Sequence, residues 1–257
     1  MSTRPLEGYT IGVTADRRSD EQMRLLADLG AECVHGPVIT TRPVGGSGGG
    51  VGSGDRASLP ADTSAAERLI RSVIDRRIDG LTFTAKTAVE RFLAIATTVG
   101  VRDELVEALE TVGVFCIGPV CASGFDELPR VEPFVPERRR LGAMVQQIAA
   151  EYARRGSVYD LGGTRVRVQG RLVVIDAESA SPDVAYLSER ERALLDALLE
   201  RPGAVHSKRD LLRRVWRGSE TDEHLVEVTV ARLRQRLGRA SDGIETVVRR
   251  GYRVGFG

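Results

Sequence analysis

Cysteine, tryptophan and lysine are scarce in this sequence, and long apolar runs are missing. The three cysteines, Cys33, Cys116 and Cys121, include no C-x-x-C pair and are too few for a disulfide scaffold. No apolar run approaches the ~18 residues that a membrane span needs, and the N-terminus lacks the apolar core of a signal peptide. With 42% apolar and 28% charged residues, we expect a soluble, cytoplasmic globular protein with reduced thiols and no membrane partner.

Lysine accounts for only two of the 37 basic residues, Lys86 and Lys208, and the others are arginine. The formal net charge of +1 conceals an uneven distribution along the chain. Residues 1–156 carry 19 basic and 21 acidic side chains, whereas residues 205–257 carry 12 basic and 7 acidic ones, a formal charge of +5. The C-terminal end is therefore a candidate surface for a polyanion.

Residues 1–155 alternate short apolar segments with helical patterns. Strands are expected at residues 10–15, 32–41, 80–84, 112–117 and 131–135. Helices are expected before Gly30, at about 62–77, 86–98 and 102–110, from about Val120, and at 137–153. Because parallel strands need crossover connections that pack on the sheet, this alternation predicts an α/β domain with a flavodoxin-like, doubly wound parallel sheet.

A glycine-rich tract interrupts this alternation at residues 45–54. It reads G-G-S-G-G-G-V-G-S-G, which has no apolar face to bury and is typical of a flexible linker. Neither G-x-G-x-x-G nor G-K-[ST] can be fitted to it, so it does not predict a phosphate-binding loop. Its simplicity indicates a designed linker in place of a segment that has been removed.

The pattern changes near residues 154–157, and residues 156–257 predict a second domain of strands, three helices and a terminal hairpin. Residues 158–176 alternate as strands do. Two helices open with S-x-x-[ED] capping boxes, one at Ser188 and one at Ser207. A third helix is expected from about Asp222, followed by a strand pair around residues 247–254.

The third helix separates two faces when it is drawn at 100° per residue. An apolar stripe is formed by Val226, Val230, Leu233 and Leu237. The opposite face holds His224, Val228, Ala231, Arg232 and Gln235, with Arg234 and Arg236 at its flanks. This layout suits a helix in a major groove, where the centre contacts base edges and the flanking cations contact phosphates. The alternative is a solvated helix surface.

Motifs around this helix resemble the winged-helix output domain of OmpR/PhoB-type transcription factors. They are L-S-E-R-E-R-A-L-L from Leu187, H-L-V-E-V-T-V-A-R-L-R from His224, and G-Y-R-V from Gly251. The resemblance implies binding to double-stranded DNA, with two copies side by side on direct repeats.

The resemblance also implies roles for individual residues. Arg232 would contact a guanine, Arg234, His224 and Trp216 would lie against the phosphate backbone, and Arg249 and Arg250 would form a wing in the minor groove. Val248 stands where the family usually places its wing arginine, which shifts the contact by one residue. For Trp216, a core position is the alternative to a phosphate contact.

Such winged helices are commonly paired with a phosphoacceptor receiver, but the required residues are missing. The third predicted strand ends in Phe83-Thr84-Ala85-Lys86, without the aspartate nucleophile. We therefore do not expect phosphorylation of an aspartate.

Three motifs of the first domain instead resemble uroporphyrinogen-III synthase. They are T-F-T-A-K-T-A-V at 82–89, V-F-C-I-G-P-V-C-A at 114–122 and P-E-R-R-R-L-G-A-M-V at 136–145. The resemblance implies a second lobe inserted where the glycine-rich tract stands, and a tetrapyrrole site between the lobes. Ala85 and Cys121 depart from the family, which has serine and threonine there, and Cys121 is expected to be a buried filler.

Helix N-termini at the carboxyl ends of the strands suit an anion. The candidate anion ligands are Arg17, Arg18, Thr84, Lys86, Thr87, Gly118 and Cys121. The alternative is a tight turn at Gly118 and a solvated loop at Arg17. No pattern predicts a catalytic residue, a metal site or a cofactor.

We expect a transcriptional regulator whose synthase-like domain senses a tetrapyrrole-like or other anionic effector, or forms a homodimer or binds a partner regulator. The resemblance to actinobacterial fusion proteins implies control of nitrate and nitrite assimilation. The alternative is a bifunctional uroporphyrinogen-III synthase in the form with both lobes, because a single lobe is expected to be inactive. A third hypothesis is a scaffold that only mediates dimerisation.

Overall fold

The computed structural model describes residues 4–42, 56–58, 62–177, 181–216 and 222–255. The chain divides into two compact units, Met1–Arg154 and Arg155–Gly257. The predicted glycine-rich linker at 45–54 lies outside the described residues. Within those residues, every helix is too short or too polar to cross a membrane.

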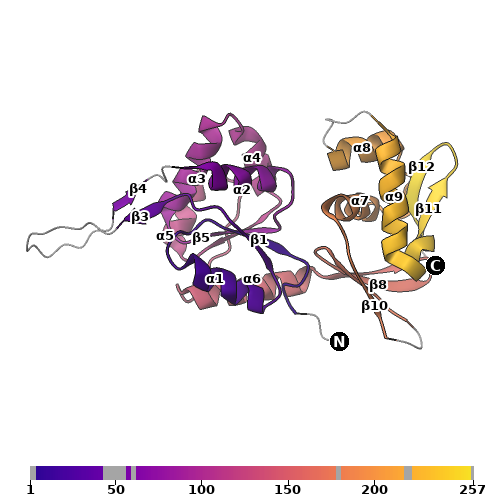
Figure 1. The fold of residues 1–257 in the computed structure, drawn as a ribbon, viewed down its shortest axis with the longest axis horizontal. Helices are drawn as coiled ribbons and strands as arrows, with labels where there is room; N and C mark the ends of the chain where they lie inside the picture. Colours follow the sequence, from indigo (N-terminus) through magenta and orange to yellow (C-terminus); the bar gives the residue numbers. More distant parts are fainter. Residues whose placement is uncertain (1–3, 43–55, 59–61, 178–180, 217–221, 256–257) are drawn as a thin grey trace, which may run out of the picture. The chain divides into compact units, whose positions relative to one another are not determined.

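The N-terminal unit is built on a parallel sheet with the strand order β2-β1-β5-β6. The strands are β1 Thr10–Val13, β2 Glu32–His35, β5 Gly80–Phe83 and β6 Gly113–Cys116. The helices are α1 Ser19–Asp28, α2 Ser64–Ile74, α3 Lys86–Thr98, α4 Arg102–Leu109, α5 Pro119–Ala122 and α6 Leu141–Arg155, with a 3-10 turn η1 at Ser123–Phe125. Helices α1 and α6 cover one face and α2, α3 and α4 the other (Figure 1). The predicted doubly wound α/β fold is confirmed.

The fifth predicted strand, at 131–135, is reduced to a single bridge. Phe134 pairs in parallel with Phe115 of β6, and its N–H donates to the Val114 carbonyl at 2.8 Å. Pro133 and Pro136 flank it and have no N–H to donate, so the ladder cannot extend. The prediction of a strand was therefore wrong in extent, although the bridge lies at the expected edge of the sheet.

The predicted strand at 32–41 is likewise two separate elements. Residues after β2 leave the sheet, and β3 (Thr40–Arg42) pairs antiparallel with β4 (Arg56–Ser58). This pairing brings the two flanks of the glycine-rich tract together, as expected if the chain leaves the domain and returns at one place.

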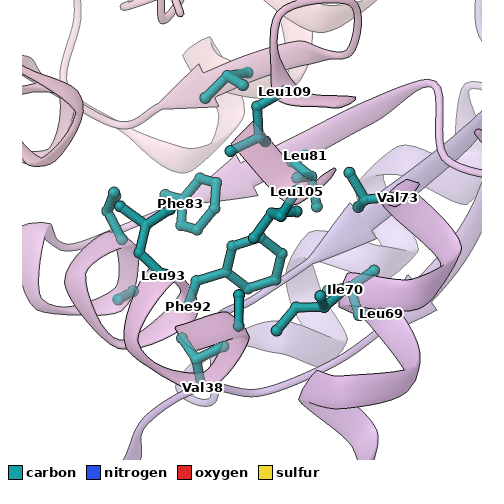
Figure 2. Close-up of a cluster of buried hydrophobic side chains, with 14 of the residues drawn as sticks. Val38, Leu69, Ile70, Val73, Leu81, Phe83, Phe92, Leu93, Leu105 and Leu109 are labelled. Carbon is teal, nitrogen blue, oxygen red and sulfur yellow. The ribbon is translucent and has the colours of Figure 1, made fainter. Parts of the chain in front are cut away.

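Aromatic and aliphatic side chains fix the carboxyl end of β5. The Phe83 ring meets the rings of Phe92 and Phe125 edge-on, with centroids 5.5 and 5.4 Å apart. Leu105 and Leu109 of α4 complete this cluster (Figure 2). Because the end of β5 is packed from several sides, the residues that follow it have a defined starting position.

The C-terminal unit consists of an antiparallel sheet, three helices and a hairpin. The sheet order is β10-β9-β8-β7, with strands β7 Ser157–Leu161, β8 Thr164–Gln169, β9 Leu172–Ile175 and β10 Asp183–Tyr186. It is followed by helices α7 Glu189–Leu199, α8 Lys208–Trp216 and α9 His224–Leu237, a 3-10 turn η2 Gly238–Gly243, and the hairpin of β11 Ile244–Val247 and β12 Gly251–Val254. The predicted winged-helix architecture is confirmed, with β10 as an additional strand.

The two predicted capping boxes differ in completeness. At α7 the Glu191 N–H donates to Ser188 Oγ and the Ser188 N–H donates to the Glu191 carboxylate, at 3.3 and 2.7 Å. At α8 the Asp210 N–H donates to Ser207 Oγ at 3.1 Å, but the Asp210 carboxylate accepts from the Ser207 hydroxyl. Aspartate is one methylene shorter than glutamate, and it engages the hydroxyl in place of the backbone N–H.

The predicted apolar stripe of α9 is buried, and we expect it to carry much of the stability of the unit. Leu233→Ala should lower the free energy of unfolding by ~2–5 kcal/mol, because it leaves a cavity against α7 and α8. Gln235→Ala, on the exposed face, should change it by less than about 0.5 kcal/mol. Urea denaturation of both variants checks the assignment of the two faces, and equal losses would contradict it.

Candidate functional site

The face of α9 predicted to contact bases is open. Ala231, Arg232, Gln235 and Arg236 are exposed, and Val228 is half-buried. Among the described residues, Arg232 forms no ion pair. Because the opposite stripe is seated on α7 and α8, this face cannot turn inward without unpacking the unit.

Arg234 braces the hairpin against α9. Its Nε and Nη2 donate to the Ile244 carbonyl at 3.0 and 2.5 Å, and Nη2 also donates to Thr246 Oγ1 at 2.9 Å. The guanidinium carbon lies 5.9 Å from the centroid of the Tyr252 ring. The resemblance assigned Arg234 to a phosphate, whereas in the structure three of its five donors hold the wing. No local pattern indicates this role, because the residues of β11 that Arg234 contacts lie ten and twelve positions further along the chain.

The tip of the hairpin presents the two predicted wing arginines. Val248, Arg249 and Arg250 connect β11 to β12 and are all exposed, and Arg249 takes a left-handed backbone conformation with φ 61°. Such a conformation costs a non-glycine residue ~1–3 kcal/mol and occurs often at functional sites. The wing therefore extends two cations from a strained turn, one position later than the family pattern.

The second wing strand is anchored to the segment before α8. The His206 N–H donates to the Tyr252 carbonyl at 2.8 Å, and the Tyr252 N–H donates back at 3.0 Å. Gly251 has φ 128°, and a Cβ there would lie 2.0 Å from the His206 carbonyl oxygen. Only glycine permits this close approach, which fixes the angle at which the wing leaves the domain.

The two other predicted phosphate contacts differ in accessibility. Trp216 is 8% exposed and belongs to the core, with the Arg190 guanidinium 5.7 Å from its ring centroid. Of its two predicted roles, burial favours the core. His224 is exposed, and its Nδ1 hydrogen-bonds to the Glu227 carboxylate at 3.1 Å.

Glu227 links the starts of α8 and α9. It forms an ion pair with Lys208 as well as its bond to His224. The Lys208 ammonium and the His224 ring lower the pKa of the Glu227 carboxyl, and Glu227 raises the pKa of Lys208. Glu227 thus stays ionised in the first turn of α9, where a negative charge is favourable to the helix dipole. No pattern in the sequence predicts this ion pair, because Lys208 and Glu227 lie in different helices.

A pocket of about 390 Å³ lies in the N-terminal unit at the carboxyl ends of β5 and β6. It is lined by Thr84, Ala85, Lys86, Thr87, Ile117, Gly118, Pro119, Val120, Cys121 and Arg139. Five of the seven predicted anion ligands are among these residues: Thr84, Lys86, Thr87, Gly118 and Cys121.

The other two predicted ligands, Arg17 and Arg18, are not among the lining residues. The Arg18 guanidinium is paired with Glu21 at 2.7 and 2.9 Å. Arg139 was missed, and its side chain packs over Gly118, 3.4 Å from where a Cβ would stand. The run of three arginines at 138–140 was the available signal, but only the fold shows which of them returns to the pocket.

The electrostatics of this pocket favour an anion. Lys86 and Arg139 bring two cations, and Lys86 pairs only loosely with Glu90, at 3.8 Å. Helix α3 starts beside them with no side-chain cap and no acidic residue in its first turn. The positive end of its dipole is therefore uncompensated by its own side chains. Among the described residues, no group of three or more histidine, cysteine or carboxylate side chains could hold a metal.

We expect the brace at Arg234 to be measurable without DNA. Arg234→Ala should lower the free energy of unfolding by about 1–2 kcal/mol, because charge-assisted hydrogen bonds to β11 are lost. Amide hydrogen exchange of β11 and β12 in the free protein should accelerate, while Arg236→Ala should leave it unchanged. If exchange of the hairpin does not respond to Arg234→Ala, Arg234 is not the brace.

Comparison with known proteins finds similarity to two kinds of protein. Residues 183–254 match the family model described as "Transcriptional regulatory protein, C terminal". The transcriptional regulatory protein TcrA of Mycobacterium tuberculosis H37Rv is 38% identical over 71 residues, 26% of this chain and 28% of its own length. A candidate uroporphyrinogen-III synthase of Methanothermobacter thermautotrophicus is 36% identical over 94 residues, 37% of this chain and 36% of its own length.

Solved structures with similarity to the chain include proteins of both kinds. Thermus thermophilus uroporphyrinogen III synthase has 18% identity over 55% of this chain and 99% of its own, with a TM-score of 0.43. The DNA-binding domain of Escherichia coli CadC has 24% identity over 40% of this chain and 94% of its own, with a TM-score of 0.33. The matches to the curated relatives span about a third of their lengths. The chain thus joins a region similar to uroporphyrinogen-III synthase to a winged-helix DNA-binding domain of the transcriptional-regulator type.

Proposed function

We propose that the protein regulates transcription by placing α9 in the major groove of duplex DNA and the β11–β12 wing in the adjacent minor groove. The observation that carries this proposal is the exposed Arg232, which projects from a helix whose opposite stripe is buried. A 14-residue helix is ~21 Å long and fits a groove ~12 Å wide. Small or uncharged neighbours, Ala231 and Gln235, leave room for the backbone of α9 to approach the bases.

The remaining cations would fix the position of the protein on the duplex. Arg236 flanks the base-reading face, and Arg249 and Arg250 extend from the wing tip. Contacts of this kind are made to phosphates or within the narrow minor groove, and they contribute affinity with little sequence preference. Two copies side by side on direct repeats would double these contacts.

The N-terminal unit is proposed to act as the sensor of this regulator. The pocket at β5 and β6 offers Lys86, Arg139 and the start of α3 to an anion, and a polycarboxylate such as a tetrapyrrole matches that chemistry. The resemblance to actinobacterial regulators leads to a more specific hypothesis, namely that the target genes serve nitrate and nitrite assimilation. A role in dimerisation or in binding a partner regulator is the alternative for this unit.

Removal of Arg232 tests the DNA-binding proposal. On an operator selected from genomic fragments, Arg232→Ala should weaken binding by ~1–3 kcal/mol and relax preference at one base position. Arg236→Ala should instead weaken binding to all sequences alike and reduce the salt dependence of log Kd by about 1. Footprinting and fluorescence anisotropy at several salt concentrations measure both effects. Operator binding by Arg232→Ala that equals that of the unchanged protein would refute the assignment of α9.

Charge reversal in the pocket tests the sensing proposal. The double variant Lys86→Glu, Arg139→Glu should bind uroporphyrin, a stable polycarboxylate tetrapyrrole, at least tenfold more weakly than the unchanged protein. Arg91→Glu is the matched control, because Arg91 is exposed on the same helix but does not line the pocket. Quenching of porphyrin fluorescence reports binding, and equal affinities of the two variants would count against the pocket.

Uroporphyrinogen-III synthase activity is a second candidate function, because the chain is 36% identical over 94 residues to a candidate uroporphyrinogen-III synthase. It applies to a form of the protein with both lobes, since the resemblance implies that the tetrapyrrole lies between them. Efficient conversion of hydroxymethylbilane to uroporphyrinogen III by that form would favour the enzyme over the sensor.

A further inference from the structure

The tip of the wing presents an apolar side chain to solvent. Val248 is 78% exposed, the largest exposed fraction among the large hydrophobic residues that the structure describes. Its neighbour Val247 is half-buried, while Ile244 and Val254, which pair across the hairpin, are fully covered. The wing therefore makes its apolar contacts with the domain through these other residues, and Val248 adds little to its packing.

The turn that carries Val248 is held in one geometry. The Arg250 N–H donates to the Val247 carbonyl at 2.9 Å, and Val247 pairs with Gly251 across the base of the turn. Arg249 takes its left-handed conformation at the third position of this turn, where glycine is usual. Because the Cβ of valine is branched, few rotamers are open to Val248, and its side chain projects from the tip in a defined direction.

Polar side chains occupy the other exposed positions of the wing. On the strands, Arg253 pairs across the hairpin with Glu245, with Nη2 2.6 Å from the carboxylate. At the tip, Arg249 and Arg250 follow Val248 directly, and neither is in an ion pair among the residues that the structure describes. Two guanidinium groups thus stand beside one apolar side chain. This combination suits the minor groove of A·T pairs, which phosphates flank and whose floor carries no hydrogen-bond donor.

We infer that Val248 contacts the floor of the minor groove and selects an A·T base pair where the wing enters. The inference rests on the proposed binding of the wing to DNA. An A·T pair presents only acceptors there, adenine N3 and thymine O2, whereas a G·C pair adds the N2 amino group of guanine. A valine methyl group displaces the water from that amino group and cannot accept its hydrogen bond, so a G·C pair leaves a donor unsatisfied. Arg249 and Arg250 hold the tip in position through the phosphates.

Modified bases test this contact without any change to the protein. The full chain selects a duplex from a random-sequence pool, and hydroxyl-radical footprinting locates the base pairs that the wing covers. At those pairs, 2,6-diaminopurine in place of adenine adds an amino group in the minor groove and leaves the major-groove edge unchanged. We expect this exchange to weaken binding by at least about fivefold. An inosine·cytosine pair, which lacks the amino group, should bind like A·T, and a G·C pair should bind like the diaminopurine pair.

A variant of the full chain tests the same contact from the side of the protein. Val248→Thr keeps the branched shape but offers a hydroxyl that can accept from the guanine amino group, so it should bind the A·T and G·C duplexes about equally. Val158→Thr is the matched control, because Val158 is an exposed valine on β7 of the same unit and lies outside the wing. It should keep the full preference of the unchanged protein. Fluorescence anisotropy measures the affinities, and circular dichroism checks that both variants are folded.

The outcomes separate this inference from the DNA-binding proposal. An unchanged protein that selects no duplex would overturn both. If Arg232→Ala weakens operator binding while diaminopurine and Val248→Thr change nothing, the DNA-binding proposal stands and the contact of Val248 with the minor groove is refuted. If Val248→Thr binds a single half-site with unchanged preference but loses the second copy on direct repeats, the tip contacts another protein chain, and the inference is overturned as well.

Discussion

The DNA-binding half of the protein depends on how one apolar stripe of α9 is seated. Val226, Val230, Leu233 and Leu237 are buried against α7 and α8, which sets the rotation of the helix about its own axis. Since side chains project at 100° intervals, that rotation alone directs Arg232 outward. The hydrophobic contact therefore decides which polar groups can meet a duplex, although none of its members would touch DNA.

The wing is attached to this frame by polar contacts of two kinds. Arg234 holds β11 from the side of α9, and the backbone pairing of His206 with Tyr252 holds β12 from the side of α8. The proposed binding to two grooves needs a fixed separation between α9 and the wing, and these contacts provide it. They also explain why Arg234, which lies next to the face proposed to contact bases, is turned toward its own hairpin.

The N-terminal unit concentrates its chemistry at one edge of the parallel sheet. Parallel strands end on the same side, so the turns after β5 and β6 meet there, and both are followed by helix N-termini. A cationic pocket lies at this edge.

Much of this architecture could be predicted from the sequence, because its determinants are local. The spacing of apolar residues in α9, the capping box at Ser188, and the alternation of strands and helices all act within a few residues along the chain. Five of the seven predicted anion ligands line one pocket, because strand ends are visible in the sequence. The short fifth strand was overestimated, since Pro133 and Pro136 limit pairing more than its apolar residues favour it.

The sequence by itself determined the order of the elements, the two faces of α9 and the glycine at the base of the wing. Only the tertiary structure decided that Arg234 braces the hairpin, that Arg139 returns to the pocket, and that Trp216 is buried. These three placements depend on contacts between residues that are distant along the chain. The sequence offers several side chains of the same type for each contact, and only the fold selects one of them. Periodicity reports which side of a helix is apolar, but it carries no information about which partner the other side will meet.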